Sequence, residues 1–174
     1  MAERVEVLIP EEEVNRRIHE IGEQISKDYA GRELHLICTL KGGVFFMCEL
    51  AKHITVPLTM DFMCVSSYGD TTKSSGVVKI TKDLDEPIMS RDVLVVEDII
   101  DSGNTLSYMI EMLQERKPAS LKLCTLLDKP ERRRKPVNVD YTGFEIPDEF
   151  VVGYGLDYAQ RYRNLPYVGI VKFE

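Results

Sequence analysis

The amino-acid sequence predicts an α/β fold in which a mostly parallel central sheet is flanked by helices. Apolar runs of strand length alternate with amphipathic helical patterns, as they do in consecutive βαβ units. The chain has 174 residues, of which 44% are hydrophobic, and this is enough for one compact domain with a sizeable core. The sequence contains no internal repeat and no linker, so a single domain is expected.

The first expected helix begins at Pro10, because a proline followed by three glutamates is typical of a helix start. Its apolar positions recur at helical spacing as far as Gly31: Val14, Ile18, Ile21 and Ile25. Three elements follow: a strand over residues 33–40, a buried helix over 43–54 and a strand over 56–68. They form a βαβ unit, whose two strands pair in parallel.

A polar stretch bracketed by glycines, residues 66–76, comes next and is a candidate lid, because its small side chains pack poorly. After a strand over 76–84, a second βαβ unit is expected: a strand over 91–99, a helix over 104–117 and a strand over 120–129. The tail holds three strand-like pieces, at 137–146, 149–157 and 165–173. In such folds ligands bind beyond the carboxyl ends of the parallel strands.

The charge and the termini restrict the class of partner. A formal net charge of −7 argues against a nucleic-acid surface, because the protein as a whole repels polyanions. No apolar stretch approaches the roughly 20 residues that cross a bilayer, and the N-terminus is acidic, unlike a signal peptide. We therefore expect a cytoplasmic protein with no nucleic-acid and no membrane partner.

The cysteines lie in apolar segments without C-x-x-C spacing, which predicts reduced core thiols rather than disulfides or zinc ligands. They are Cys38, Cys48, Cys64 and Cys124. The histidines also lack the spacing of zinc ligands. The basic run over residues 131–135 is expected to be a solvated or subunit-facing loop, because it stands in a polar part of an acidic chain.

The most informative stretch is VLVVEDIIDSGNTL, residues 93–106. Its apolar run ends in Glu97 and Asp98, and Asp101 then precedes a pattern that suits a phosphate cradle: Ser102, Gly103, Asn104 and Thr105. The sequence patterns of NTPase and dinucleotide loops are absent. Three carboxylates beside a phosphate fit a ligand that also has hydroxyl groups and brings a divalent cation, such as a ribose phosphate with Mg²⁺.

This run resembles the signature of the type I phosphoribosyltransferases, and its details are closest to the hypoxanthine-guanine phosphoribosyltransferases of the purine-salvage branch. Four further strings resemble that family in its order: LKGG (40–43), SSYG (66–69), LLDKP (126–130) and IPDEFVVGYGLDYAQRYRNLPYVG (146–169). The resemblance covers essentially the whole chain. It implies one phosphoribosyltransferase domain over 1–174, with a small hood contributed by the N-terminal segment and about 130–174.

The resemblance implies transfer of the 5-phosphoribosyl group from phosphoribosyl pyrophosphate to hypoxanthine or guanine, with Mg²⁺ as cofactor, giving IMP or GMP and pyrophosphate. It also implies a homodimer or a homotetramer. By likeness to the family, Asp101 is the general base at a purine ring nitrogen. The positions that match the family's donor site are Glu97, Asp98, Ser102, Gly103, Asn104, Thr105, Lys41, Gly42, Arg163 and, at the lid tip, Ser67 and Tyr68.

The positions that match the family's purine site are Lys129, Phe150, Val151 and Asp157. Of these, Lys129 would donate to the 6-oxo group and Phe150 would stack on the base. The magnesium ligands would be Glu97, Asp98 and Asp157. The family often has a cis peptide between the positions that match Leu40 and Lys41.

The sequence opposes two other functions and leaves a third open. A regulatory protein on the same fold, with RNA as its target, would share the acid pair, but the charge of −7 and the matching purine positions oppose it. A phosphoacceptor receiver domain with Asp140 as acceptor is rejected, because too little chain follows Val93. A transferase for another purine or pyrimidine stays open, as does the preference among hypoxanthine, guanine and xanthine.

Overall fold

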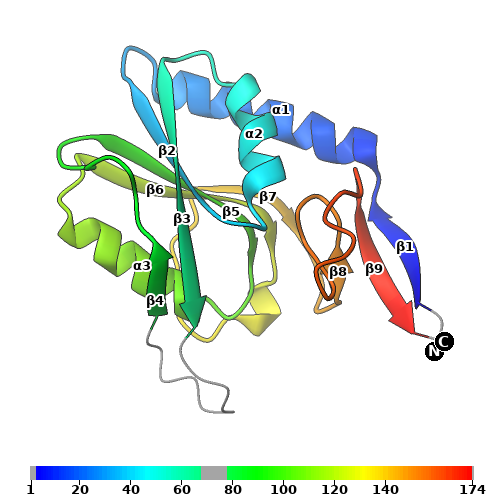
Figure 1. Cartoon of the computed structure of the whole chain (residues 1–174). Helices are drawn as coiled ribbons and strands as arrows, with labels where there is room; N and C mark the ends of the chain where they lie inside the picture. The colour runs from blue at the N-terminus through cyan, green and yellow to red at the C-terminus, as the bar shows by residue number, and fades with distance from the viewer. Residues whose placement is uncertain (1–2, 68–77, 174) are drawn as a thin grey trace.

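The structure is a computed structural model that describes residues 3–67 and 78–173 (Figure 1). Its helices are α1 (Glu11–Asp28), α2 (Val44–Lys52), α3 (Asn104–Glu115) and a short 3-10 helix, η1 (Pro130–Arg132). Its strands are β1 (Glu3–Ile9), β2 (Leu34–Thr39), β3 (Leu58–Ser67), β4 (Val78–Lys82), β5 (Asp92–Ile100), β6 (Ser120–Asp128), β7 (Tyr141–Glu145), β8 (Val151–Val152) and β9 (Val168–Phe173). Nearly all of the candidate lid lies outside the described residues.

The central sheet has the strand order β4-β3-β2-β5-β6-β7. Its neighbouring strands pair in parallel, except that β3 and β4 pair antiparallel at one edge. Parallel neighbours need a crossover, and α2 and α3 supply it between β2 and β3 and between β5 and β6. The predicted α/β class with a mostly parallel sheet is confirmed.

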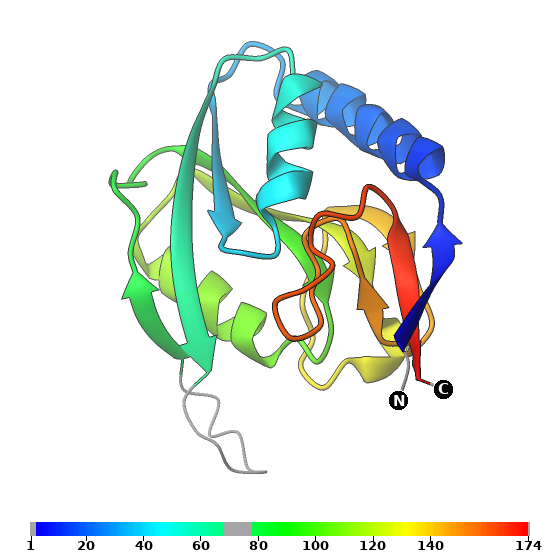
Figure 2. The same ribbon diagram turned by 45° about the vertical axis from the view of Figure 1, so that its right-hand side comes forward.

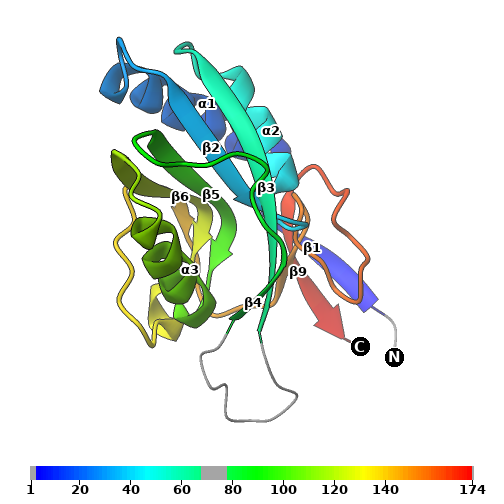
Figure 3. The ribbon, with the colours of Figure 1, turned by 60° about the vertical axis from the view of Figure 1, so that its left-hand side comes forward.

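Helices cover both faces of this sheet: α1 and α2 lie on one face and α3 on the other (Figure 3). Successive side chains of a strand point to opposite faces, so β5 contributes to both halves of the core. Leu94 and Val96 pack in the cluster that contains α1 and α2, whereas Val93 and Val95 pack in the cluster that contains α3. The strand that leads into the acid pair is therefore held rigidly from both sides.

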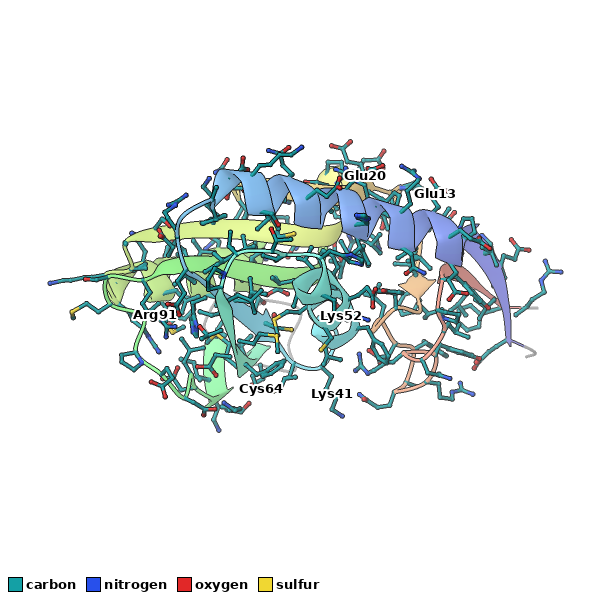
Figure 4. The ribbon with its side chains drawn as sticks, turned by 90° about the horizontal axis from the view of Figure 1, so that it is seen from above. Glu13, Glu20, Lys41, Lys52, Cys64 and Arg91 are labelled. Atoms are coloured by element: carbon teal, nitrogen blue, oxygen red, sulfur yellow. The ribbon has the colours of Figure 1, made fainter. Side chains whose placement is uncertain are left out.

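The predicted apolar stripe of α1 is confirmed, and α3 likewise buries one side. In α1 the buried residues include Val14, Ile18, Ile21 and Ile25, and in α3 they are Leu106, Met109 and Leu113. On the outer side of α1, Glu13 and Glu20 point away from the sheet (Figure 4). Within the described residues, none of the helices combines the length and the apolarity needed to cross a bilayer.

A second, antiparallel sheet joins the two ends of the chain in the order β1-β9-β8. Figure 2 shows β9 (red) between β1 (blue) and β8 (orange). The three tail pieces do contain β7, β8 and β9, but the sequence did not predict β1. Only Ile9 of β1 is buried, so its apolar pattern is weak, and its pairing partner β9 lies at the far end of the chain.

The expectation of a buried helix over 43–54 is only half right. Phe46, Met47 and Leu50 of α2 are buried, but Phe45 is 45% exposed and Cys48 is also exposed. The prediction that all the cysteines are core thiols is therefore wrong for Cys48, because an amphipathic placement of this apolar helix leaves one side uncovered. All four cysteines are unpaired, as predicted.

Candidate active site

The carboxyl ends of the central strands border a cavity of about 400 Å³. The ends of β2 and β5, the segment Asp101–Gly103, the first turns of α3 and two tail residues, Asp157 and Arg163, form its wall. Parallel strands place their carboxyl ends at one edge of a sheet, which is why segments so distant in sequence meet there. Asp101, the predicted general base, lines this cavity. The residues predicted for the donor site that line it are Gly42, Glu97, Asp98, Ser102, Gly103, Thr105 and Arg163.

The acid pair forms the floor of the cavity. Both residues are partly buried, and burial, with the neighbouring Asp98 carboxylate, raises the pKa of Glu97 to about 8. The hydroxyl of Thr39 donates a hydrogen bond to Glu97. Burial likewise raises the pKa of Asp98, although the backbone N–H of Ile99 donates to its Oδ1 at 2.9 Å. The charge of Arg163 acts against this rise at Asp98 but does not cancel it, and a cationic ligand would favour the ionised form of both carboxyls.

The turn after β2 packs directly on this acid pair. The peptide bond between Leu40 and Lys41 is cis, as the resemblance implied. Gly42 faces the carboxylate of Asp98 on one side and Gly155 of the tail on the other, so closely that a side chain at Gly42 or Gly155 would overlap its neighbour. Backbone N–H groups of the turn are thereby held at the cavity wall.

The segment after β5 builds the opposite wall. Gly103 has φ +80°, a left-handed conformation that glycine adopts without penalty, and the chain then enters α3 at Asn104. The Oγ of Ser102 accepts a hydrogen bond from the N–H of Asn104 at 3.3 Å. The first N–H groups of a helix have no intrahelical partner and carry partial positive charge, which suits an anion. Asn104 itself does not line the cavity.

The basic run over residues 131–135, called the basic loop below, braces this segment. The backbone N–H groups of Arg134 and Lys135 donate to the carbonyl oxygen of Ser102 at 2.9 and 3.2 Å. The guanidinium of Arg133 pairs with Asp128, and the two side chains are only 18% and 12% exposed. The expectation of a solvated or subunit-facing loop is therefore wrong for Arg133, because the chain after β6 folds back over the loop after β5.

Asp157 and Arg163 approach the cavity from the tail. The Nη2 of Arg163 lies 3.0 Å from Oδ1 of Asp157, and its Nη1 donates to the carbonyl oxygen of Gly155 at 2.7 Å. The Nε of Arg163 is buried and has no hydrogen-bond partner among the described residues. A partly buried guanidinium with an unused donor at a cavity wall is suited to an anionic ligand.

The structure does not place every predicted residue in the cavity wall. Lys129 and Val151 are buried just outside it, and Phe150 is 51% exposed with its ring edge-to-face against Tyr158 at 5.7 Å between centroids. Lys129 is nevertheless close to the acid segment, since its backbone N–H donates to the carbonyl oxygen of Ile100 at 3.0 Å. None of the three is among the residues that line the cavity.

Lys41 points away from the sheet (Figure 4), and its Nζ contacts Gln160 at 3.3 Å. Its side chain therefore does not reach the wall, although its backbone belongs to the turn. Tyr68 and the side chain of Ser67 lie outside the described residues.

The predicted magnesium ligands do not form a preassembled cage. Across residues 3–67 and 78–173, no group of three or more His, Cys, Asp or Glu side chains is arranged to hold a metal ion. Glu97, Asp98 and Asp157 all line the cavity, but Arg163 already pairs with Asp157. A magnesium ion there would need oxygen atoms from a bound ligand, which is the usual arrangement for this ion.

Sequence reasoning missed three contacts of the site. Thr39 bonds to Glu97, and the basic loop contributes Arg133 against Asp128 and Arg132 against Asp101. The sequence contained a signal for the last two, namely three consecutive arginines, residues 132–134, a few residues after the end of β6. The three arginines indicate a positively charged segment, but they do not show which carboxylates pair with them.

The chain is similar over most of its length to known phosphoribosyltransferases. A model of the phosphoribosyl transferase domain matches residues 9–159. The chain is 57% identical over 98% of its length to a hypoxanthine phosphoribosyltransferase of Salmonella typhimurium, of which it covers 97%. It is 55% identical over 95% of its length to a hypoxanthine-guanine phosphoribosyltransferase of Bacillus subtilis, of which it covers 92%. The crystal structure of a hypoxanthine phosphoribosyltransferase from Staphylococcus aureus is similar with a TM-score of 0.93 and 51% identity, over 96% of this chain and 91% of that one.

Proposed function

This chain belongs to the phosphoribosyl transferase domain family, and from that premise we propose that it transfers the 5-phosphoribosyl group of phosphoribosyl pyrophosphate to hypoxanthine or guanine in purine salvage. The products are IMP or GMP and pyrophosphate. The observation that carries the proposal is that an acid pair, a helix N-terminus and a partly buried guanidinium line the same cavity. A ribose that bears phosphate groups can use all three: the acid pair binds its hydroxyl groups, and the helix N-terminus and the guanidinium bind its phosphates.

The donor occupies the cavity along its length. Its 5′-phosphate lies on the segment Asp101–Thr105, where backbone N–H groups and the start of α3 supply fixed positive potential. Glu97 and Asp98 accept hydrogen bonds from the ribose hydroxyl groups. The pyrophosphate lies between the backbone of Gly42 and the guanidinium of Arg163, whose Nε is otherwise without a partner within the described part of the chain.

Magnesium fits the same cavity through Glu97, Asp98 and Asp157. The support is the raised pKa of Glu97 and Asp98, which marks carboxyls with too little positive charge around them. When bound, the ion offsets the negative charge of the donor's pyrophosphate. Removal of divalent cations should therefore abolish turnover.

The purine lies at the mouth of the cavity. Phe150 stacks on the ring, Val151 contacts it through its main chain, and Lys129 donates to the 6-oxo group. One purine ring nitrogen attacks C1′ as the bond from C1′ to the pyrophosphate oxygen breaks. Asp101 accepts the proton that the purine loses from its other ring nitrogen.

An assay of nucleotide formation against a panel of bases tests the proposal. Purified protein is incubated with phosphoribosyl pyrophosphate and either hypoxanthine, guanine, xanthine, adenine or uracil, with Mg²⁺ or with excess chelator. We expect IMP and GMP only in the presence of Mg²⁺. Turnover of uracil or adenine alone would assign the protein to another branch of the family, and full turnover in chelator would remove the magnesium assignment.

We further propose that the protein self-associates and acts in the cytoplasm. A second pocket of about 500 Å³ beside α2 contains the exposed ring of Phe45 together with Tyr154 and Leu165, an apolar surface suited to contact with another copy. The four unpaired cysteines suit a reducing compartment. Light scattering of the purified protein distinguishes a monomer, a dimer and a tetramer.

A further inference from the structure

Four side chains of alternating charge form a row beside the cavity. The Nε of Arg132 donates to Oδ1 of Asp101 at 3.0 Å, and its Nη1 lies 3.6 Å from Oδ2 of Asp148. The other carboxylate oxygen of Asp148, Oδ1, lies 3.9 Å from the Nζ of Lys129. The order along the row is Asp101, Arg132, Asp148 and Lys129, and its formal charges cancel.

The row rests on rigid backbone. Arg132 ends η1, and its backbone N–H donates to the carbonyl oxygen of Lys129 at 3.1 Å. The N–H of Lys129 in turn donates to the carbonyl oxygen of Ile100, the residue before Asp101. The two ends of the row are therefore connected both through backbone hydrogen bonds and through charged side chains.

Each end of the row keeps hydrogen-bonding capacity free for a ligand. Arg132 engages only Oδ1 of Asp101, and Oδ2 of that carboxylate accepts no hydrogen bond from the described residues. At the other end, Lys129 is 7% exposed, and among those same residues its ammonium makes only the long contact to Asp148. The carboxylate of Asp101 thus offers a hydrogen-bond acceptor and the ammonium of Lys129 offers donors. Arg132 and Asp148, which lie between them, orient both groups.

We propose that Arg132 and Asp148 are positioning residues for the purine: they orient the carboxylate of Asp101 toward the ring nitrogen that loses its proton and the ammonium of Lys129 toward the 6-oxo group. This inference rests on the function proposed above. Neither residue touches the substrate. Arg132 fixes the orientation of the Asp101 carboxylate, and Asp148 ties Arg132 to the ammonium of Lys129.

If Arg132 and Asp101 formed only an isolated, exposed ion pair, substitution of Arg132 would have a much smaller effect on kcat/KM. Such pairs contribute little to stability, because both charges stay in water, and they give no reason for a change in turnover. The pair of Arg132 and Asp101 is itself about half exposed, with side-chain exposures of 48% and 46%. The test must therefore measure whether the effect of Arg132 on kcat/KM depends on Asp101, and not whether Arg132 stabilises the fold.

A double-mutant cycle with Arg132→Gln and Asp101→Asn supplies that measurement. Arg132→Gln alone should lower kcat/KM for hypoxanthine about 10-fold and leave KM for phosphoribosyl pyrophosphate unchanged. In the Asp101→Asn background the same change should lower kcat/KM less than about 2-fold, because the group that it positions is no longer a base. Arg132→Lys, which keeps the charge without the planar guanidinium, should restore part of the loss.

Arg16→Ala is the matched control, because Arg16 and Glu20 form another exposed arginine–carboxylate pair, on α1 and outside the cavity wall. It should change kcat/KM by less than about 2-fold. Asp148→Asn should lower kcat/KM for hypoxanthine, and its effect should not add to that of Arg132→Gln.

Full activity of Arg132→Gln would overturn the inference, and so would a loss of equal size with and without Asp101. Either result leaves the proposed function intact as long as the unmodified protein forms IMP. Absence of IMP from the unmodified protein would instead reject the proposed function itself.

Discussion

Gly42 packs against the carboxylate of Asp98 so closely that a Cβ at position 42 would overlap Oδ2. Gly42→Ala should therefore turn the Asp98 side chain out of place while the fold survives, because only a carboxylate has to move. We expect kcat/KM for phosphoribosyl pyrophosphate to fall about 10²-fold or more, with Tm changed by only a few degrees.

Gly31→Ala is the control for this experiment. Gly31 has φ +80°, but nothing lies within 4 Å of an added Cβ. Alanine at this position should therefore lower the unfolding free energy by about 1 kcal/mol through backbone strain and leave kcat/KM unchanged. If Gly42→Ala retains normal donor kinetics, the turn does not depend on contact with Asp98.

Asp101→Asn should preserve the shape of the phosphate segment and remove the general base. Turnover should fall about 10²-fold or more, while KM for phosphoribosyl pyrophosphate changes little. Steady-state kinetics with each substrate varied in turn separate the two quantities. A variant that keeps turnover but loses donor affinity would make Asp101 a phosphate-site residue instead.

Lys129→Ala tests the choice of purine. An ammonium has donors and no acceptor, so beside a stacked purine it satisfies a 6-oxo group and opposes a 6-amino group. The unmodified protein should favour hypoxanthine over adenine by about 10⁴-fold, and the variant should narrow that ratio by weakening the 6-oxopurines. An unchanged ratio would show that Lys129 serves only to hold Asp148 and the end of β6.

Stability should fall as the pH rises from about 5 to 8, because the pKa of Glu97 is raised to about 8 in the folded protein from an ordinary value of 4.5. Between these values the folded state binds the proton more tightly than the unfolded state, so the stabilisation is complete below pH 4.5 and is lost through pH 8. We expect Tm to decrease by about 10 °C over this range.

Glu97→Gln should flatten this pH dependence without removing it, since burial raises the pKa of Asp98 too. Scanning calorimetry of both proteins between pH 5 and 8 makes the comparison. A parallel decrease in the two proteins would mean that Glu97 is not the titrating group.

The basic loop should contribute to stability through one arginine in particular. Arg133 and Asp128 are both mostly buried, so Arg133→Ala leaves a carboxylate without its partner and should cost about 3 kcal/mol of unfolding free energy. The side chain of Arg134 is exposed, and Arg134→Ala should leave unfolding in urea unchanged. Equal midpoints for both variants would show that Arg133 is solvated after all.

Local signals in the sequence determined most of the fold and the centre of the site. The periodicity of Val14, Ile18, Ile21 and Ile25 predicted α1, because a helix buries the stripe that its own repeat creates. Glu97, Asp98 and the segment that follows also have a local signal, because a strand end and a helix start lie within a few residues of each other. Neighbours in sequence specify such features.

Contacts between distant segments were decided only by the tertiary structure. β1 exists because β9 pairs with it, Gly42 matters because Asp98 lies against it, and Arg132 meets Asp101 because the chain after β6 folds back. Cys48 is exposed although its segment is apolar, because one face of α2 has no covering element in the described structure. Periodicity shows which side of an element is apolar, whereas the packing of all the elements determines what each side chain contacts.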